Sequence, residues 1–252
     1  MSILEGRIAI ITGASSGIGR ACAIRFAEEG ASLVVCARRL DRLQSLVEEI
    51  KAAGSSALPV ACDVAKEADI TKVVQAAMDR FGRIDILANI AQGGMDKFGG
   101  LMDTKAEDVL DAFRTGALQS FLFMQKCFPY MKERGYGRII NTSSPAAVTG
   151  ISGLTAYIMT KGAIMALTRN ASQEWGKFGI VTNTFLPWVR TENFDRSDLA
   201  KNLVAMEASS PLGRMGTPYE DCTPMVAFLA SEGAGYINGQ VIAVDGGRRL
   251  IG

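Results

Sequence analysis

Near the N-terminus the chain reads Ile8-Ala-Ile-Ile-Thr-Gly-Ala-Ser-Ser-Gly-Ile-Gly19. The apolar residues at its start predict a short buried strand, and apolar residues from Ile18 to Phe26 recur at helical spacing. The glycines between them predict a tight turn, in which a Cβ would block the close approach of a ligand. A strand, a glycine-rich turn and a helix place backbone N–H groups where they can bind a pyrophosphate. Because the spacing is G-x-x-x-G-x-G, an ordinary strand-to-helix turn is the alternative.

Apolar segments of strand length alternate with helical segments along the whole chain. Strands are expected near residues 8–11, 32–36, 57–61, 85–89, 138–142, 179–186 and 241–244. Such alternation predicts a parallel sheet with right-handed crossovers. No linker, charge block or internal repeat divides the 252 residues, so residues 1–252 are expected to form a single α/β domain.

The composition excludes several classes of protein. Lys and Arg total 27 against 26 Asp and Glu, and this balance favours neither nucleic acid nor an anionic membrane as partner. No apolar run has transmembrane length, and the N-terminus does not resemble a signal peptide. Five scattered cysteines indicate reduced core residues in a cytoplasmic protein. The chain has no histidine, which excludes a Ser-His-Asp triad and a His-ligated zinc, and no metal site is expected.

The end of the second predicted strand bears on the choice of nucleotide. NAD-binding folds place an acid there, about twenty residues past the glycines, to bind the ribose 2′-OH. This chain instead has Arg38, 19 residues after Gly19, followed by Arg39. A guanidinium can pair with a 2′-phosphate, so we predict NADP. The alternative is a solvated helix start, although cations are unfavourable at a helix N-terminus.

Candidate catalytic groups follow the fifth predicted strand, which ends at Ser144. Tyr157 and Lys161 lie four residues apart and share one face of a helix. A nearby ammonium favours the phenolate, which would make Tyr157 a workable acid and base near neutral pH. Ser144 could donate a hydrogen bond to a substrate oxygen as charge develops on it. Alone, such a pair is more often a half-buried Tyr and a snorkelling Lys on an amphipathic helix.

The motifs occur together in one order: the turn from Thr12 to Gly19, then Asp63, Asn89, Ser144, Tyr157, Lys161, and Val244-Asp-Gly-Gly247. In this order and spacing they resemble the classical short-chain dehydrogenase/reductase family over essentially the whole chain. The resemblance implies a three-layer, doubly wound Rossmann-type fold with a seven-stranded parallel sheet, assembled as a homotetramer. It implies that Tyr157 is the catalytic acid/base and that Ser144 orients the substrate oxygen. Lys161 would hold the nicotinamide ribose and lower the pKa of Tyr157.

The same resemblance implies a set of cofactor contacts. Asp63 and Val64 would flank the adenine, Asn89 would support the central sheet, and Arg38 matches the NADP-preferring subgroup. The complete set is Gly13, Ser15, Ser16, Gly17, Ile18, Gly19, Arg38, Asp63, Val64, Asn89, Tyr157, Lys161, Pro187, Val189 and Thr191.

Three departures from the family pattern stand out. The family's N-N-A-G is here Asn89-Ile-Ala-Gln92, and its P-G-x-V-x-T is here the shorter Pro187-Trp-Val-Arg-Thr191. A helix position that usually carries a catalytic Asn is Gly116. We expect this glycine to leave room for a water, which backbone carbonyls at a helix kink and Lys161 would hold.

The sequence therefore predicts an NADP(H)-dependent oxidoreductase that moves hydride between nicotinamide and a secondary alcohol or carbonyl. A 3-oxoacyl-thioester (acyl-carrier) reductase is one alternative, and a catalytically weak nucleotide-binding protein is another. The physiological substrate and the reaction direction stay open. An apolar substrate pocket, ordinary packing or subunit contacts would each explain a set of apolar residues: Met95, Phe98, Trp188, Phe194, Leu199, Leu203 and Met206. Helices at 106–134 and 155–177 are expected at a subunit interface, because the first is apolar beyond one stripe.

Overall fold

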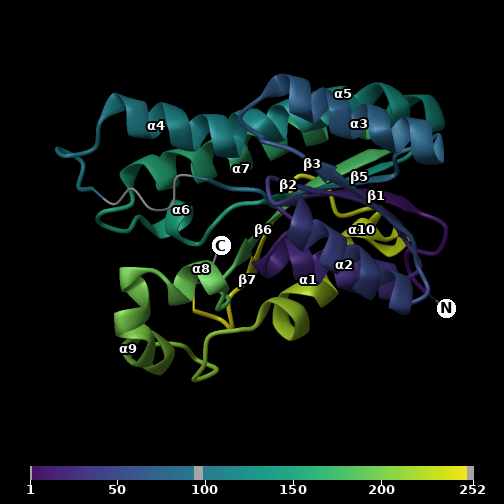
Figure 1. The fold of residues 1–252 in the computed structure, drawn as a ribbon. Helices are drawn as coiled ribbons and strands as arrows, with labels where there is room; N and C mark the ends of the chain where they lie inside the picture. Colours follow the sequence, from purple (N-terminus) through teal and green to yellow (C-terminus); the bar gives the residue numbers. More distant parts are fainter. Residues whose placement is uncertain (1, 94–98, 249–252) are drawn as a thin grey trace.

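Seven parallel strands form one sheet in the order β3-β2-β1-β4-β5-β6-β7 in this computed structural model, which describes residues 2–93 and 99–248 (Figure 1). The strands are β1 (Ile8–Thr12), β2 (Ser32–Ala37), β3 (Ala57–Ala61), β4 (Ile86–Asn89), β5 (Gly137–Thr142), β6 (Ile180–Pro187) and β7 (Val241–Val244). Each predicted strand is present, and the parallel pairing confirms the expected fold class.

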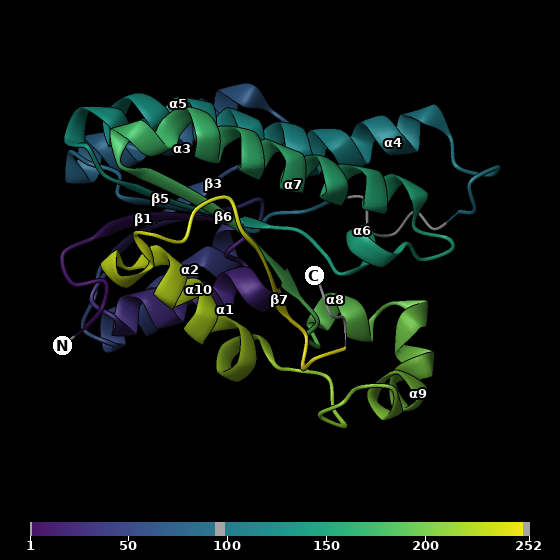
Figure 2. The same ribbon diagram turned by 180° about the vertical axis from the view of Figure 1, so that it is seen from behind.

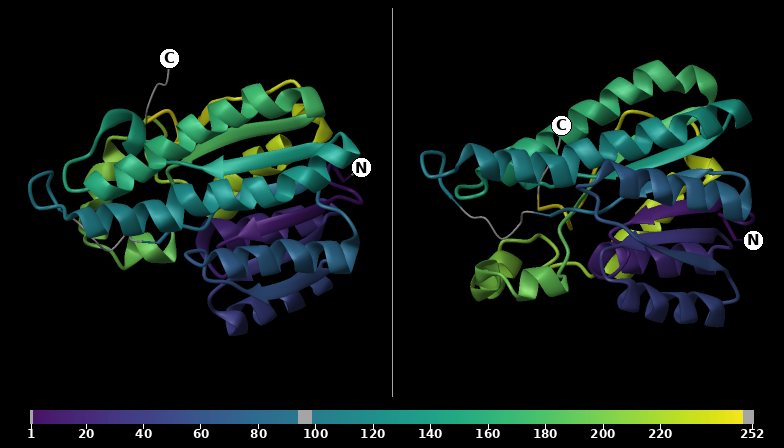
Figure 3. Two further views of the ribbon diagram at one scale, coloured as in Figure 1. Left: turned by 90° about the horizontal axis from the view of Figure 1, so that it is seen from above. Right: turned by 45° about the horizontal axis from the view of Figure 1, so that its top comes forward.

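Helices cover both faces of the sheet, which gives the expected three layers (Figures 1 and 2). One face carries α1 (Gly17–Glu28), α2 (Leu40–Ala52) and α10 (Thr223–Ala230). The other carries α3 (Glu67–Phe81), α4 (Ala106–Phe113), α5 (Gln119–Arg134) and α7 (Thr155–Trp175), several of which are seen from above in Figure 3. Shorter segments are α6 (Ala146–Thr149), α8 (Glu192–Asp195), α9 (Leu203–Ala208), η1 (Arg114–Leu118), η2 (Gly176–Phe178), η3 (Asp198–Asn202), η4 (Pro218–Cys222) and η5 (Glu232–Ala234).

The core consists of two apolar clusters, one on each face of the sheet. Successive residues of a strand point to opposite faces, so Ile11 packs with Phe26 of α1 while Ile10 packs with Phe123 of α5. Because both faces are covered, the central strands are continuous apolar runs rather than alternating ones. Burial of each such side chain stabilises the fold by about 1.5–3 kcal/mol.

The strand order reverses direction between β1 and β4, and ligands of open α/β sheets bind at such a point, outside the carboxyl ends of the strands. Thr12 at the end of β1 fixes this edge. Its Oγ1 accepts hydrogen bonds from the backbone N–H groups of Ile90 at 2.9 Å and Ala91 at 3.0 Å. The loop after β4 is thereby held beside the glycine-rich turn.

The predicted helical region from Ala106 to Arg134 is one continuous rod, but a π turn at η1 interrupts its regular hydrogen bonding around Gly116. Its apolar residues do lie on more than one face, since Phe123 is buried while Leu110 is 60% exposed and Phe121 is 42% exposed. In the part of the chain that the structure describes, no helix is both long and apolar enough to cross a membrane.

Candidate active site

The glycine-rich turn between β1 and α1 brings backbone groups together at the strand ends. A Cβ on Gly13 would lie 2.9 Å from the Cα of Ala91, and a Cβ on Gly19 would collide with the Gly13 carbonyl. Gly17, at a φ of +54°, begins α1, whose first turn carries no acidic residue. The free N–H groups of that turn and the positive end of the helix dipole fit a pyrophosphate.

A basic group lies over this turn, but it is Arg39 and not the predicted Arg38. Arg39 Nη2 donates to Ser15 Oγ at 3.0 Å and to Ser16 Oγ at 3.2 Å. Arg38 is exposed, and the described residues offer it no hydrogen bond. Both arginines precede the N-terminus of α2 at Leu40. The sequence predicted only Arg38 as a ligand contact, because spacing alone does not tell which of two adjacent arginines contacts the glycine-rich turn.

The other residues predicted around the adenine are close to the same edge. Asp63 follows β3 and accepts a hydrogen bond from the Ala65 N–H at 3.1 Å, which is ordinary turn chemistry. Val64 is partly buried against the apolar cluster beneath α3, and Ile18 packs in the same way against the cluster beneath α1. Asp63 and Val64 thus follow the carboxyl end of β3, and Ile18 lies in the first turn of α1.

A buried chain of polar side chains supports the strands behind the site. Asn89 Nδ2 donates to Asn141 Oδ1 at 2.9 Å, and Asn141 Nδ2 donates to Thr168 Oγ1 at 2.9 Å. Thr184 Oγ1 donates to Thr168 Oγ1 at 2.6 Å. The chain joins β4, β5 and β6 to α7. Only Asn89 was predicted, because its three partners stand in no local pattern that reports the contact.

The three predicted catalytic residues come together at the carboxyl end of β5. Ser144 follows this strand and lies close enough to Tyr157 of α7 to lower the pKa of its hydroxyl. Lys161, one turn along α7, is 2% exposed and lies with its Nζ 5.7 Å from the centre of the Tyr157 ring. That Nζ donates to the carbonyl of Thr142 at 2.8 Å, while Ser143 Oγ donates to the Lys161 carbonyl at 2.8 Å. Two hydrogen bonds from β5 therefore fix the helix turn that carries the reacting groups.

Electrostatics in this cluster differ from the expectation that Lys161 lowers the pKa of Tyr157. Burial raises the pKa of Tyr157 above its ordinary value, and the neighbouring Ser144 hydroxyl offsets only part of this effect. Burial lowers the pKa of Lys161 to about 7. Because neither side chain has a charged partner among the described residues, the pKa shifts of both are set mainly by desolvation, which disfavours the charged form of each group. Tyr157 is consequently protonated at neutral pH and ready to act as an acid.

The shortened segment after β6 lies against the glycine-rich turn. Pro187 ends β6, and Val189 forms a bridge with Gly216. Thr191 caps α8 by accepting from the Phe194 N–H at 3.3 Å, and its methyl group would be 3.5 Å from a Cβ on Gly17. The omission of one residue thus still leaves Thr191 beside the proposed pyrophosphate site.

Short helices on two sides of the strand ends carry partly exposed apolar residues. Phe194, Leu203 and Met206 are partly exposed on α8 and α9, which lie across the strand ends from α6 (Figure 1). Val148 of α6 is 44% exposed and Ile151 is 43% exposed; neither was singled out from the sequence. Met95, Phe98 and the side chain of Leu199 lie outside the described residues.

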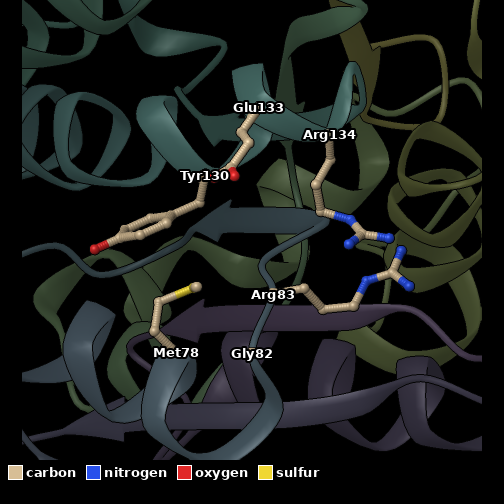
Figure 4. Close-up of a pocket in the computed structure, with 6 residues that line it drawn as sticks. All are labelled: Met78, Gly82, Arg83, Tyr130, Glu133 and Arg134. Carbon is tan, nitrogen blue, oxygen red and sulfur yellow. The ribbon is translucent and has the colours of Figure 1, made fainter.

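A hollow of about 400 Å³ lies elsewhere, and Figure 4 shows its lining. It is bordered by Met78, Gly82, Arg83, Tyr130, Glu133 and Arg134. Gly82 and Arg134 precede β4 and β5, so this hollow is at the amino ends of the strands. It contains none of the predicted site residues, and we do not assign the chemistry to it.

Side chains of Thr160 and Gln92 fill the space beside Gly116, so the prediction that this glycine leaves room for a water is wrong. A Cβ at Gly116 would lie 2.6 Å from Thr160 Oγ1 and 2.7 Å from Gln92 Oε1. The carbonyls expected to be free at the kink are also occupied. That of Asp111 accepts from Thr115 Oγ1 at 2.8 Å, and that of Gly116 accepts from Ser120 Oγ at 2.9 Å.

The fold and the site together define an oxidoreductase of the Rossmann class. A family model described as enoyl-(acyl carrier protein) reductase matches residues 13–249. The short-chain reductase protein NovJ of Streptomyces niveus is 37% identical over 98% of this chain and 96% of its own length. The 3-oxoacyl-(acyl-carrier-protein) reductase FabG of Thermotoga maritima is 33% identical over 97% of this chain and 98% of its own length.

Solved structures agree with these relatives. The structure of 7α-hydroxysteroid dehydrogenase complexed with NADH and 7-oxo glycochenodeoxycholic acid matches with a TM-score of 0.92 at 32% identity, covering 98% of this chain and 97% of that one. The chain belongs to the classical short-chain dehydrogenase/reductase family. Members of this family are oxidoreductases that use NAD or NADP.

Proposed function

We propose that this protein is an NADP(H)-dependent oxidoreductase of the cytoplasm that acts on a secondary alcohol or the corresponding carbonyl of largely apolar character. The observation that carries the proposal is the proximity of Ser144, Tyr157 and the buried Lys161 at the carboxyl end of β5. All five cysteines are buried free thiols, as suits a reducing compartment.

In the proposed reaction, the bound nicotinamide supplies or accepts the hydride. During reduction Tyr157 donates its phenolic proton to the substrate oxygen, and Ser144 donates a hydrogen bond to the same oxygen as negative charge develops. Lys161 is held by the Thr142 carbonyl and places positive charge next to the phenolate that forms. We expect Tyr157→Phe to lower kcat by about a thousandfold while leaving cofactor affinity unchanged. Full activity of this variant on every accepted ketone would contradict the assignment.

The preference for NADP is supported by two arginines and by the absence of a carboxylate at the end of β2. Charge-assisted contacts to a 2′-phosphate are worth about 1.5–3 kcal/mol, or roughly ten- to a hundredfold in affinity. Titrations of NADPH and NADH by fluorescence test this preference. Arg38→Asp and Arg39→Asp should each weaken NADPH selectively, whereas Lys51→Asp at the far end of α2 should not. Equal affinity for the two cofactors in the native protein would refute the preference.

The substrate proposal rests on the apolar residues of α6, α8 and α9 and on the steroid ketone named for the structural relative. The alternative of a 3-oxoacyl-thioester reductase is supported by the relative from Thermotoga maritima. A panel of cyclic ketones and 3-oxoacyl thioesters, followed by NADPH absorbance, separates these two. The remaining alternative, a weak nucleotide-binding protein, predicts binding of NADPH without turnover of any of them.

We further propose that the protein assembles as a homotetramer, with α4, α5 and α7 at one interface. Their outer surface exposes large apolar side chains, including Leu110, Phe113 and Phe121 of the rod and Met159 of α7 at 54%. Several large exposed apolar side chains on neighbouring helices are typical of a protein–protein contact. Sedimentation should give four times the monomer mass at micromolar concentration, and a monomer would contradict the proposal.

A further inference from the structure

Two departures from the family pattern, which lie 24 residues apart in the sequence, are in contact in the structure. Gly116 stands at the π turn between α4 and α5, and the carboxamide of Gln92 lies where a side chain at position 116 would begin. Thr160 adjoins the same point from α7 and accepts a hydrogen bond from the Ala117 N–H at 3.0 Å. On α7, Thr160 is three residues from Tyr157 and immediately precedes Lys161. The Gln92 carboxamide therefore adjoins the helix turn that carries the reacting groups.

The orientation of this carboxamide is set by its neighbour. Gln92 Nε2 donates to the Gly93 carbonyl at 2.7 Å. A flipped amide would place two acceptor oxygens together, so the nitrogen must face Gly93. The opposite atom, Oε1, is buried and has no donor among the residues that the structure describes. A buried carbonyl oxygen without a donor is costly, so a bound water would be a favourable partner for it.

Several other acceptors beside Gly116 already have a donor. Thr115 and Ser120 satisfy the carbonyls of Asp111 and Gly116, and the Thr160 hydroxyl accepts from Ala117. Lys161 uses one of its three N–H groups on the Thr142 carbonyl. Among the described residues, three buried carboxamide oxygens near the strand ends have no donor: Asn89 Oδ1, Gln92 Oε1 and Gln119 Oε1. Of these, Gln92 Oε1 lies against Gly116 and Thr160, where it could hold a water near the ammonium.

We infer that Gln92 is a positioning residue for the return of the proton to Tyr157, and this inference rests on the proposed function. Each reduction consumes one hydride and the phenolic proton of Tyr157 and leaves a phenolate. The phenolate regains its proton from bulk water through a bound water that Gln92 Oε1 holds by accepting a hydrogen bond. An O–H bond of the bound water breaks and the phenolic O–H bond of Tyr157 forms. The bound water then regains a proton from bulk water, so that the hydroxide ends in the solvent.

The test uses Gln92→Met, which keeps the volume beside Gly116 but removes the acceptor. Tyr157 starts each experiment protonated, so the first turnover after mixing with NADPH and ketone should keep its native rate. Steady-state kcat should fall about ten- to a hundredfold, with KM unchanged and a larger solvent isotope effect. Imidazole buffer should restore the rate in proportion to its concentration, because it replaces the missing proton donor. A residue that acts only through packing would show neither the burst nor the buffer dependence.

Two further variants complete the experiment. Gln119→Met removes a neighbouring carboxamide, which donates to the Ala91 carbonyl at 3.3 Å, and it should show no burst and no buffer dependence. Gln92→Glu keeps an acceptor oxygen at the same reach and should retain most of the steady-state rate if Gln92→Met folds poorly. A native-like steady state in Gln92→Met, or a loss that imidazole does not relieve, would overturn the inference alone. A native protein that turns over no carbonyl would overturn the proposed function and this inference together.

Discussion

Two turns of the backbone build this site, and both depend on glycine for different reasons. In the turn after β1, a Cβ at Gly13 or Gly19 would strike backbone atoms of Ala91 or Gly13. In the π turn between α4 and α5, a Cβ at Gly116 would instead strike the ends of two side chains, Thr160 and Gln92. The first turn requires glycine whatever its neighbours are, because no mutation of a neighbouring residue removes the backbone atoms that a Cβ would strike. The second requires glycine only as long as its two neighbours are present.

The comparison predicts its largest effect at the first turn. Gly19→Ala should lower the free energy of unfolding by about 3 kcal/mol or more, because a β-carbon there forces two backbone segments apart. Urea denaturation measures the loss. Gly162→Ala in α7 is the matched control: its Cβ would meet nothing within 4 Å, and helix propensity should raise stability by about 0.5–1 kcal/mol. Similar stability of the two variants would show that the first turn tolerates a side chain.

The same difference explains what the sequence could predict. The strand, turn and helix from Ile8 to Phe26 could be predicted because their pattern lies in consecutive residues. The same is true of the other strands of the sheet and of the spacing between Tyr157 and Lys161. Contacts between side chains from separate elements, such as Gln92 against Gly116, leave no local pattern. The pKa of Tyr157 belongs to this second kind, because its burial depends on the whole fold.

A smaller loss of stability is expected at the second turn, and a second mutation should restore part of it. Gly116→Ala should cost about 1–3 kcal/mol from overpacking against Thr160 and Gln92. The double variant with Gln92→Ala should recover part of this cost, because the carboxamide is the flexible end of a long side chain. A coupling of about 0.5–3 kcal/mol in the double-mutant cycle is the expected size for residues in contact. Strictly additive costs would mean that Thr160 or the π turn alone requires the glycine.

A further effect concerns charge beside the second turn: Lys161, which follows Thr160 on α7, is a buried titratable group. Its pKa is lowered from 10.5 to about 7 by burial. Between these two pH values the folded protein binds fewer protons than the unfolded chain, so stability should rise with pH through this window. The contribution of one group cannot exceed about 1.4 kcal/mol per pH unit, and it vanishes below pH 7 because both states are then charged. Lys161→Met should remove this slope from urea titrations, whereas Lys51→Met, an exposed lysine on α2, should keep it. If the slope persisted in Lys161→Met, Lys161 would be charged in the folded protein, and its ammonium would already stabilise the Tyr157 phenolate before any ligand binds.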